Sequence, residues 1–460
     1  MKILFVSLGC DKNRVETEYM LGLLSEHGYE FTDDALDAEA AVVNTCCFIN
    51  DAKQESIDTI LELADLRKSG KLRALIVAGC LGQRYKEEIQ KEIPEVDDII
   101  GTTAYDKVVN ALDGVIKGQI QNYFEDIDRK PTTHKRILST GTSYSYLKIA
   151  EGCNKNCTYC IIPKVRGHYR SIPMDDLVNE AVDLAQNGIK ELIVIAQETT
   201  VYGVDLYGKK MLPALLERLC KIDGIEWIRV MYCYPEEITD ELIQVIKDEP
   251  KICHYLDLPI QSGSDNILKR MGRRTDNADI REIVEKLRRN IPDICLRTTL
   301  ITGFPGETKE DHNKTMQLVS DLKFDRLGVF TYSPEEDTVA AKMDEQVPEI
   351  TKKQRRKQLM KMQQQIAFES ARNMVGRKLG AVIEGRISDD NPIIDDFGRP
   401  LYTYVARTYK DSPDIDGFIF IENVPYDLMS GKFVDVKVKG SDEYDLIGEL
   451  DDDDEVDLNS

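Results

Sequence analysis

Three cysteines stand close together in the sequence, at Cys153, Cys157 and Cys160, with the spacing Cys-x3-Cys-x2-Cys. We call them the compact triad. Three thiolates are one short of a closed tetrahedral metal site. A four-iron cluster that receives only three protein thiolates keeps one iron open for another ligand. A zinc site would need His168 as its fourth ligand, at a spacing that is not typical of zinc sites. The pattern therefore favours an iron-sulfur cluster with an open iron, and an open iron indicates chemistry rather than structure.

Three further cysteines, Cys10, Cys46 and Cys80, are far apart in the sequence, and we call them the dispersed triad. Each follows a short apolar run rich in β-branched residues, and the runs are Ile3–Leu8, Ala41–Asn44 and Ala74–Ala78. Polar, helix-patterned segments separate the runs, which is typical of parallel strands with crossover helices. The carboxyl ends of such strands meet at one edge of the sheet. We therefore expect a second three-thiolate site there, the alternative being three buried structural cysteines. Cys47 is assigned to packing, although exchange with Cys46 stays open.

Length and composition are those of a large enzyme in a reducing compartment. The chain has 460 residues, 42% of them hydrophobic, and 11 cysteines. The length predicts about three domains, and so few cysteines are too sparse for a disulfide scaffold. The apolar run near the N-terminus is shorter than the core of a signal peptide. No run of about 20 apolar residues exists to span a membrane. We expect a cytoplasmic protein with no membrane partner.

The order of the patterns predicts an α/β protein with three folded regions. Residues 1–117 predict a flavodoxin-like parallel α/β domain, and 118–142 a polar linker. Residues 143–371 alternate strands with helices, and six such units suit a partial (β/α)6 barrel whose active site lies at the strand carboxyl ends. The six predicted strands are Tyr146–Ala150, Leu192–Ala196, Trp227–Tyr232, Tyr255–Ile260, Cys295–Ile301 and Leu327–Tyr332. A long helix is expected to begin near Ile350.

The last region is expected to form a small antiparallel β-barrel of the oligonucleotide-binding kind over residues 372–448. Its candidate strands are Ala381–Ile383, Thr403–Ala406, Phe418–Ile421 and Phe433–Lys439. An acidic tail is expected over 449–460. Residues 372–460 hold 10 Lys and Arg against 21 Asp and Glu, a net charge of -11 within a chain of net charge -22. Because nucleic-acid binding depends largely on Lys and Arg at phosphates, this charge argues against a nucleic-acid substrate. It favours a basic protein partner.

The compact triad, with Tyr159 before its last cysteine, resembles the signature of the radical S-adenosylmethionine enzymes. That resemblance implies that S-adenosylmethionine occupies the open iron and yields a 5'-deoxyadenosyl radical, while the protein supplies position. The polar or glycine-rich loops that follow the predicted barrel strands are then expected to hold this cofactor. The candidate cofactor-binding residues are Tyr159, Arg166, Gln197, Glu198, Gln261, Ser262, Gly303 and Gly306.

Taken together, the regions resemble the methylthiotransferase family, whose members join a three-cysteine domain, a radical S-adenosylmethionine barrel and a TRAM β-barrel. The segment Val6–Asn13 is similar to that of the RimO-type enzymes, with Asp11 where Pro is common and Cys47 where Gly is common. Other matching segments are Asn44–Cys46, Gly79–Cys80, Leu256–Gly263 and Gly303–Thr308.

The resemblance implies two 4Fe-4S clusters, bound by the compact and dispersed triads, and S-adenosylmethionine as cofactor. It implies transfer of a methylthio group to the β-carbon of an aspartate in small-subunit ribosomal protein twelve. The alternatives are a methylthiotransferase acting on adenosine in transfer RNA, and a non-catalytic iron-sulfur electron carrier or ribosome-assembly factor. The sulfur donor and the electron donor stay open.

Overall fold

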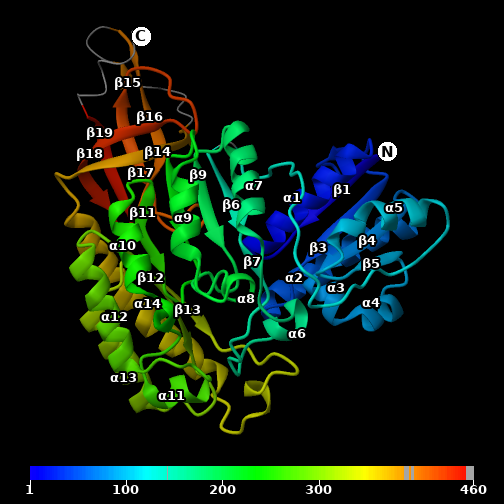
Figure 1. Cartoon of the computed structure of the whole chain (residues 1–460), viewed down its shortest axis with the longest axis horizontal. Helices are drawn as coiled ribbons and strands as arrows, with labels where there is room; N and C mark the ends of the chain where they lie inside the picture. The colour runs from blue at the N-terminus through cyan, green and yellow to red at the C-terminus, as the bar shows by residue number, and fades with distance from the viewer. Residues whose placement is uncertain (142, 388–392, 395–397, 452–460) are drawn as a thin grey trace.

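The computed structural model describes residues 1–141, 143–387, 393–394 and 398–451. Within these residues the chain forms one five-stranded sheet, two six-stranded sheets and a two-stranded ribbon. Figure 1 shows the first sheet at one end of the molecule, the central sheet in the middle and the C-terminal sheet at the other end. No described helix combines the length and apolar character that a bilayer crossing requires.

The first sheet is entirely parallel and has the strand order β2-β1-β3-β4-β5. Its strands are β1 (Lys2–Ser7), β2 (Glu30–Thr32), β3 (Ala40–Thr45), β4 (Ala74–Gly79) and β5 (Asp98–Ile100). The helices around it are α1 (Asp11–Glu26), α2 (Asn50–Lys68), α3 (Cys80–Arg84), α4 (Lys86–Glu92) and α5 (Val108–Ile116). This order is that of flavodoxin, so the predicted flavodoxin-like fold is confirmed. The three-residue strands β2 and β5 were not predicted.

The central sheet is also parallel, with strands in sequence order from β6 to β13, and it confirms the partial (β/α)6 barrel. Its strands are β6 (Tyr144–Lys148), β9 (Glu191–Ile195), β10 (Trp227–Val230), β11 (Ile252–Asp257), β12 (Cys295–Thr302) and β13 (Arg326–Thr331). The ribbon strands are β7 (Ala150–Glu151) and β8 (Arg170–Ser171). Its helices are α6 (Ile162–Arg166), α7 (Met174–Gln186), α8 (Val204–Tyr207), α9 (Leu212–Cys220), α10 (Asp240–Asp248), α11 (Asp265–Arg270), α12 (Asn277–Asn290), α13 (Lys309–Leu322) and α14 (Glu349–Arg372).

Helix α1 of the first region covers the inner face of the central sheet. Val15 and Tyr19 from this helix share one buried apolar cluster with Tyr146, Ile193 and Tyr255 of the barrel strands. The outward side chains of the same strands pack in a separate cluster against the surrounding helices. Because α1 begins directly after Cys10, this packing brings the dispersed triad to the barrel.

The C-terminal sheet has the order β14-β18-β19-β17-β16-β15, and pairing of β14 with β16 closes five of these strands into a barrel. The strands are β14 (Lys378–Arg386), β15 (Ile393–Ile394), β16 (Pro400–Thr408), β17 (Ile419–Val424), β18 (Phe433–Asp442) and β19 (Asp445–Leu450). The predicted barrel is confirmed, but β17 and β19 pair in parallel. Since β19 extends to Leu450, Glu449 belongs to the barrel rather than to the acidic tail. Residues 452–460 of that tail lie outside the described residues.

Buried ion pairs join the C-terminal barrel to the amino-terminal ends of the central strands. Glu191, at the start of β9, accepts hydrogen bonds from Arg229 Nε at 2.7 Å and from Arg407 Nη2 at 2.9 Å. All three side chains are at most 1% exposed. The loop between β16 and β17 adds Asp416, 3.6 Å from Arg297 Nε. The C-terminal barrel therefore lies at the end of the central sheet opposite its carboxyl-terminal loops.

Candidate active site with two cysteine triads

The dispersed triad follows the carboxyl ends of three neighbouring strands, as the sequence predicted. Cys10 comes after β1, Cys46 directly after β3, and Cys80 directly after β4. Two glycines with positive φ permit the close approach of these loops. A Cβ atom on Gly9 would lie 2.6 Å from Cys46 Cβ, and one on Gly79 would lie 2.7 Å from the Thr45 carbonyl oxygen. Any larger residue would push the strand ends apart.

Asn13 in the first turn of α1 connects these loops. Its Nδ2 donates to the carbonyl oxygens of Leu8 at 3.0 Å and Thr45 at 2.9 Å. Asn44 Nδ2 in turn donates to the Asn13 carbonyl oxygen at 2.9 Å. These bonds fix the start of α1, and with it Cys10, against the ends of β1 and β3.

The compact triad lies in the loop that follows β7, beside the carboxyl ends of the central strands. Thr158, between Cys157 and Cys160, donates from its amide to the Met271 carbonyl at 2.9 Å and from its hydroxyl to the Arg270 carbonyl at 2.8 Å. The Thr158 carbonyl accepts the Ala340 amide at 2.8 Å. The end of α11 and the loop after β13 therefore both hold the cysteine loop in place.

Burial favours the protonated form of two thiols in each triad, Cys46 and Cys80 in the dispersed triad and Cys153 and Cys160 in the compact triad. It raises the pKa of Cys46 and of Cys153 to about 11. Burial also raises the pKa of Cys80 and of Cys160 above the ordinary value, and neighbouring thiols of the same triad raise both further. Ligation by either triad must therefore release protons, which a metal's own charge favours.

The triads are not arranged around a single ion. Among the described residues no group of three or more His, Cys, Asp and Glu side chains is placed to hold one metal ion. In a four-iron cluster each thiolate binds a different iron, so the thiolates stand farther apart than ligands that share one ion.

Arg166, which the sequence assigned to cofactor binding, lies against the dispersed triad. Its Nε and Nη2 atoms are each 3.3 Å from Cys80 Sγ. Nη2 also donates to Asn13 Oδ1 at 2.5 Å, and Nη1 donates to Glu16. Arg166 is 1% exposed. Since Arg166 ends the short helix that follows the compact triad, one side chain links the two triads.

Arg166 belongs to a buried cluster of four charged side chains. The other members are Glu16, Lys148 and Glu151. Lys148 Nζ donates to Glu16 Oε1 and to Glu151 Oε2, both at 2.8 Å. Arg166 Nη1 is 3.4 Å from Glu151 Oε1. Two cations and two carboxylates balance one another, which permits all four to be buried.

Several polar atoms in the loops that follow the central strands are buried without a hydrogen-bond partner. They include Gln197 Oε1, Glu198 Oε2 and Gln261 Oε1. Burial raises the pKa of Glu198 to about 7, and Gln261 has a positive φ of 71°. Buried polar atoms in proteins are normally hydrogen-bonded. The two glutamines therefore have buried acceptors that a polar cofactor would satisfy, and Glu198 Oε2 has only a long ion pair, 3.8 Å from Lys155 Nζ.

The other predicted cofactor residues have different surroundings. Ser262 is buried, and its hydroxyl oxygen accepts the Ser264 amide at 3.2 Å, so it shapes its own turn. A Cβ on Gly303 would lie 2.2 Å from the Lys352 side chain, and one on Gly306 would lie 2.5 Å from the Arg270 guanidinium. Tyr159 packs edge-on against Phe304, with ring centroids 6.4 Å apart. These four residues bring the rim loops close together.

Arg273 is a candidate that the sequence did not indicate. It is 8% exposed, and its Nε and Nη1 atoms have no hydrogen-bond partner. Its guanidinium lies 4.2 Å from the ring centroid of Tyr234, whose hydroxyl is 3.8 Å from Cys157 Sγ. Two unpaired donors beside the compact triad suit an anionic group such as a carboxylate. In the sequence, Arg273 is one of several arginines near α11, so only the packing distinguishes it.

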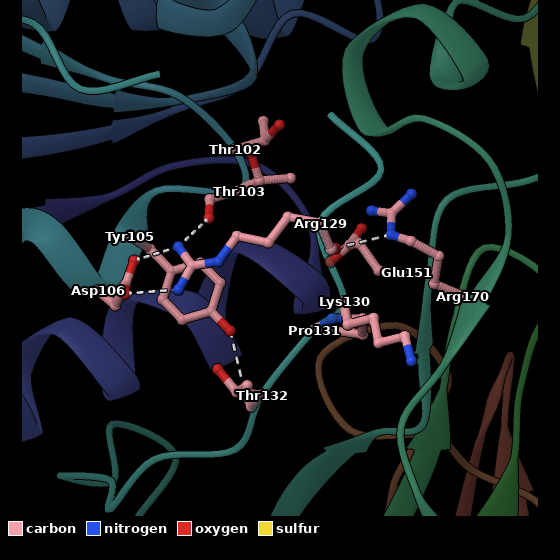
Figure 2. Close-up of a pocket in the computed structure, with 10 residues that line it drawn as sticks. All are labelled: Thr102, Thr103, Tyr105, Asp106, Arg129, Lys130, Pro131, Thr132, Glu151 and Arg170. Carbon is pink, nitrogen blue, oxygen red and sulfur yellow. Dashed lines mark hydrogen bonds and ion pairs between the residues drawn. The ribbon is translucent and has the colours of Figure 1, made fainter. Parts of the chain in front are cut away.

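A small pocket marks the seam between the first region, the linker and the barrel (Figure 2). Figure 2 shows Arg129 paired with Asp106, at 2.8 Å for both guanidinium contacts, and Tyr105 bound to Thr132 of the linker. The pocket's free volume of about 10 Å³ is room for about one water molecule. The pocket is therefore a packing gap between the three regions and is too small for a substrate.

Comparisons with known proteins cover all three regions of the chain. Residues 2–101 match the uncharacterized protein family UPF0004, 147–319 the radical SAM superfamily, and 375–450 the TRAM domain. The chain is 59% identical to "Ribosomal protein uS12 methylthiotransferase RimO" of Lachnoclostridium phytofermentans, over 97% of this chain and 99% of that protein. It is 48% identical to the protein of the same name from Clostridioides difficile, over 98% and 99%.

A solved structure shares the fold of this chain. It is TsrM from Kitasatospora setae, a radical S-adenosylmethionine methyltransferase with cobalamin and a 4Fe-4S cluster bound. The TM-score is 0.54 at 13% identity, over 72% of this chain and 76% of that one. At this identity the likeness concerns the fold alone.

Proposed function

The chain belongs to the ribosomal protein uS12 methylthiotransferase (RimO) family, and we propose from this premise that it adds a methylthio group to the β-carbon of an aspartate in ribosomal protein uS12. The observation that carries the proposal is the pair of three-thiol sites, one at the edge of each parallel sheet, with Arg166 reaching from one to the other. A protein with a single structural metal site would not need two incomplete three-thiol sites.

The compact triad is proposed to hold one 4Fe-4S cluster and the dispersed triad a second. When bound, the two clusters and S-adenosylmethionine supply the radical that removes the substrate hydrogen and the sulfur-binding iron that delivers the methylthio group. The chain's own part is to hold six thiolates at two sheet edges.

S-adenosylmethionine is proposed to bind at the rim loops beside the compact triad. Glu198, with one buried oxygen that accepts no hydrogen bond and lies 3.8 Å from Lys155 Nζ, suits the cofactor's amino group. Arg273, with two donor atoms that make no hydrogen bond, suits its carboxylate. Gln197 and Gln261 offer further acceptors. Tyr159, Ser262, Gly303 and Gly306 support these loops rather than offer free polar atoms.

Arg166 is proposed to hold the dispersed triad in position. A charged donor at 3.3 Å from Cys80 Sγ stabilises the thiolate form, and donors to cluster sulfurs raise the reduction potential. Because Arg166 belongs to the segment of the compact triad, this contact also fixes the two sites relative to each other.

The chain has a net charge of -22, which favours a basic ribosomal protein as its partner. In the loop before β17, Asp411 pairs with Arg326 and Asp416 pairs with Arg297. Both arginines belong to the central barrel, so these two acids are already neutralised within the chain. Other acids of the C-terminal barrel, such as Glu422, Asp442 and Glu443, are exposed to solvent and can interact with a partner. We propose that these acids attract the substrate over long range.

The domain boundaries that we propose are 1–117, 118–142, 143–371 and a C-terminal barrel that begins at 372 and runs to the end of β19 at Leu450, two residues past the 448 expected from the sequence, with the acidic tail after it. A cytoplasmic location is proposed with them, because ribosomal proteins are made and assembled there.

The direct test is a reaction with the reconstituted protein, S-adenosylmethionine, a reductant and a sulfur source under oxygen-free conditions. Purified uS12 and transfer RNA are offered in separate reactions. Mass spectrometry should find a methylthio group on one aspartate of uS12. Modification of transfer RNA alone, or no cleavage of S-adenosylmethionine at all, would contradict the proposal.

A further inference from the structure

Lys12 is a buried lysine at the start of α1, two residues after Cys10. It is 5% exposed, and its Nζ atom lies 3.0 Å from the ring centroid of Tyr232. Tyr232 follows β10 at the rim of the barrel and has a positive φ of 59°. A positive φ is costly for a bulky aromatic residue and is found where surrounding contacts impose it, often at functional sites.

Tyr232, whose ring contacts the Lys12 ammonium group, lies between the two triads. Tyr232 Oη donates to Asp11 Oδ2 at 2.8 Å, and Asp11 is the neighbour of Cys10. Two residues further along the same rim segment, the Tyr234 hydroxyl is 3.8 Å from Cys157 Sγ. One short segment thus contacts the dispersed triad's loop at one end and the compact triad at the other. The ammonium group on the Tyr232 ring is placed in the intervening space.

The carboxylates around Lys12 are engaged elsewhere. Asp11 accepts the Tyr232 hydroxyl, Asp257 pairs with Arg297 at 3.3 Å, and Glu151 pairs with Lys148 at 2.8 Å. Within the part of the chain that the structure describes, Lys12 has no ion-pair partner. A buried cation is normally paired, and the face of an aromatic ring supplies only part of that stabilisation. The ammonium group is therefore suited to an anion that comes from outside the chain.

We propose that Lys12 binds the carboxylate of the substrate aspartate, an assignment that rests on the proposed function. In an aspartate side chain the carboxylate carbon is bonded directly to the β-carbon. An ammonium group that holds the carboxylate between the triads consequently holds the β-carbon there as well. Lys12 would thus select an acidic side chain and position the carbon that is modified.

The first test uses the unaltered holoenzyme, reconstituted with both clusters, and two fluorescent peptides from uS12 that span the modified aspartate. The peptides differ only in Asp or Asn at the modified position, and binding is followed by fluorescence anisotropy. Because a hydrogen bond to a charged group is worth more than a neutral one, the Asp peptide should bind about 10- to 100-fold more tightly. Equal binding of the two peptides would overturn the proposal without any variant.

The second test uses Lys12→Met, which keeps the length and apolar contacts of the side chain but removes the charge. The preference for Asp over Asn should fall to within about 2-fold. Lys91→Met, at a lysine whose side chain is 81% exposed in the same region, is the matched control and should keep the full preference. Iron content of each variant is measured to confirm that both clusters are present. An unchanged preference in Lys12→Met would overturn the proposal.

Two other anions could occupy the same ammonium group, and the measurements separate them. If Lys12 held the carboxylate of S-adenosylmethionine, Lys12→Met would weaken binding of that cofactor while the peptide preference stayed unchanged. If it held an anionic sulfur ligand of the dispersed-triad cluster, the variant would alter the electron paramagnetic resonance spectrum with added methanethiolate, again without changing the preference. Either result would overturn the substrate assignment. Failure of the proposed function has a different signature, namely no methylthio group on the Asp peptide in the unaltered enzyme.

Discussion

Substitution Arg166→Met removes one cation from a buried group of two cations and two carboxylates. The remaining Lys148 already lies 2.8 Å from both Glu16 and Glu151, so it cannot take over the contacts that Arg166 makes with Asn13 and Cys80. Methionine fills most of the space of the aliphatic stem. The change therefore isolates the loss of charge and of hydrogen bonds.

The expected cost follows from the burial of these groups. Arg166 and Glu16 are both 2% exposed in their side chains, and breaking a buried pair by removing one partner costs about 3–5 kcal/mol. That is a large part of the about 5–15 kcal/mol by which folded domains are stable. Adding Glu16→Gln restores the charge balance. The double variant should therefore be more stable than the sum of the two single changes predicts, by about 1–3 kcal/mol.

The assay is urea unfolding of the metal-free protein under reducing conditions, followed by circular dichroism, with midpoints compared at unchanged slope. Arg73→Met is the control, because Arg73 and Glu39 are 3.6 Å apart and about half exposed. Exposed pairs of this kind contribute about 0–1 kcal/mol. The reasoning would be refuted if Arg166→Met lowered the free energy of unfolding no more than Arg73→Met does. It would also be refuted if the change in the double variant equalled the sum of the two single changes.

Three further predictions concern the triads and the substrate. Alanine at all three positions of the compact triad should lower bound iron from about eight to about four atoms per chain and abolish cleavage of S-adenosylmethionine, whereas retained cleavage would contradict the cofactor assignment. Alanine at the dispersed triad should also leave about four irons but stop methylthio transfer while some cleavage persists. Loss of both activities in a protein that keeps those four irons would argue against separate roles. Binding of uS12 should weaken as ionic strength rises from about 0.05 M to about 0.5 M, since screening shortens the reach of the acidic surface, and binding indifferent to salt would exclude the proposed attraction.

Much of the fold could be predicted because most of its strands appear in the sequence as separate apolar segments. Ala40–Thr45 and Ala74–Gly79 are buried along their whole length, as parallel strands covered on both faces must be. The strands β2 and β5 have three residues each, too few to produce a period. β19 was missed because its acidic residues continue directly into the tail, and its parallel pairing with β17 depends on distant residues.

The cysteine triads could be predicted from strand ends, but the surroundings of the triads could not. Lys12, Asn13 and Glu16 are polar residues on a helix, a pattern that normally indicates a solvated face. They are buried because α1 packs into the barrel, where Lys148 and Arg166 meet Glu16 from more than 130 positions away. The same packing turns Arg166 to Cys80 rather than to the rim loops. Arg166 is close to the compact triad in the sequence, and that closeness does not indicate that its side chain contacts Cys80.

The most direct test of the central claim is tandem mass spectrometry of uS12 after incubation with the reconstituted protein, S-adenosylmethionine, a reductant and a sulfur source. The account predicts that one aspartate gains a methylthio group in place of a hydrogen on its β-carbon, and that the product is absent when either triad is replaced by alanine. An unmodified uS12 in a reaction that cleaves S-adenosylmethionine, or a product that forms without the dispersed triad, would contradict the account.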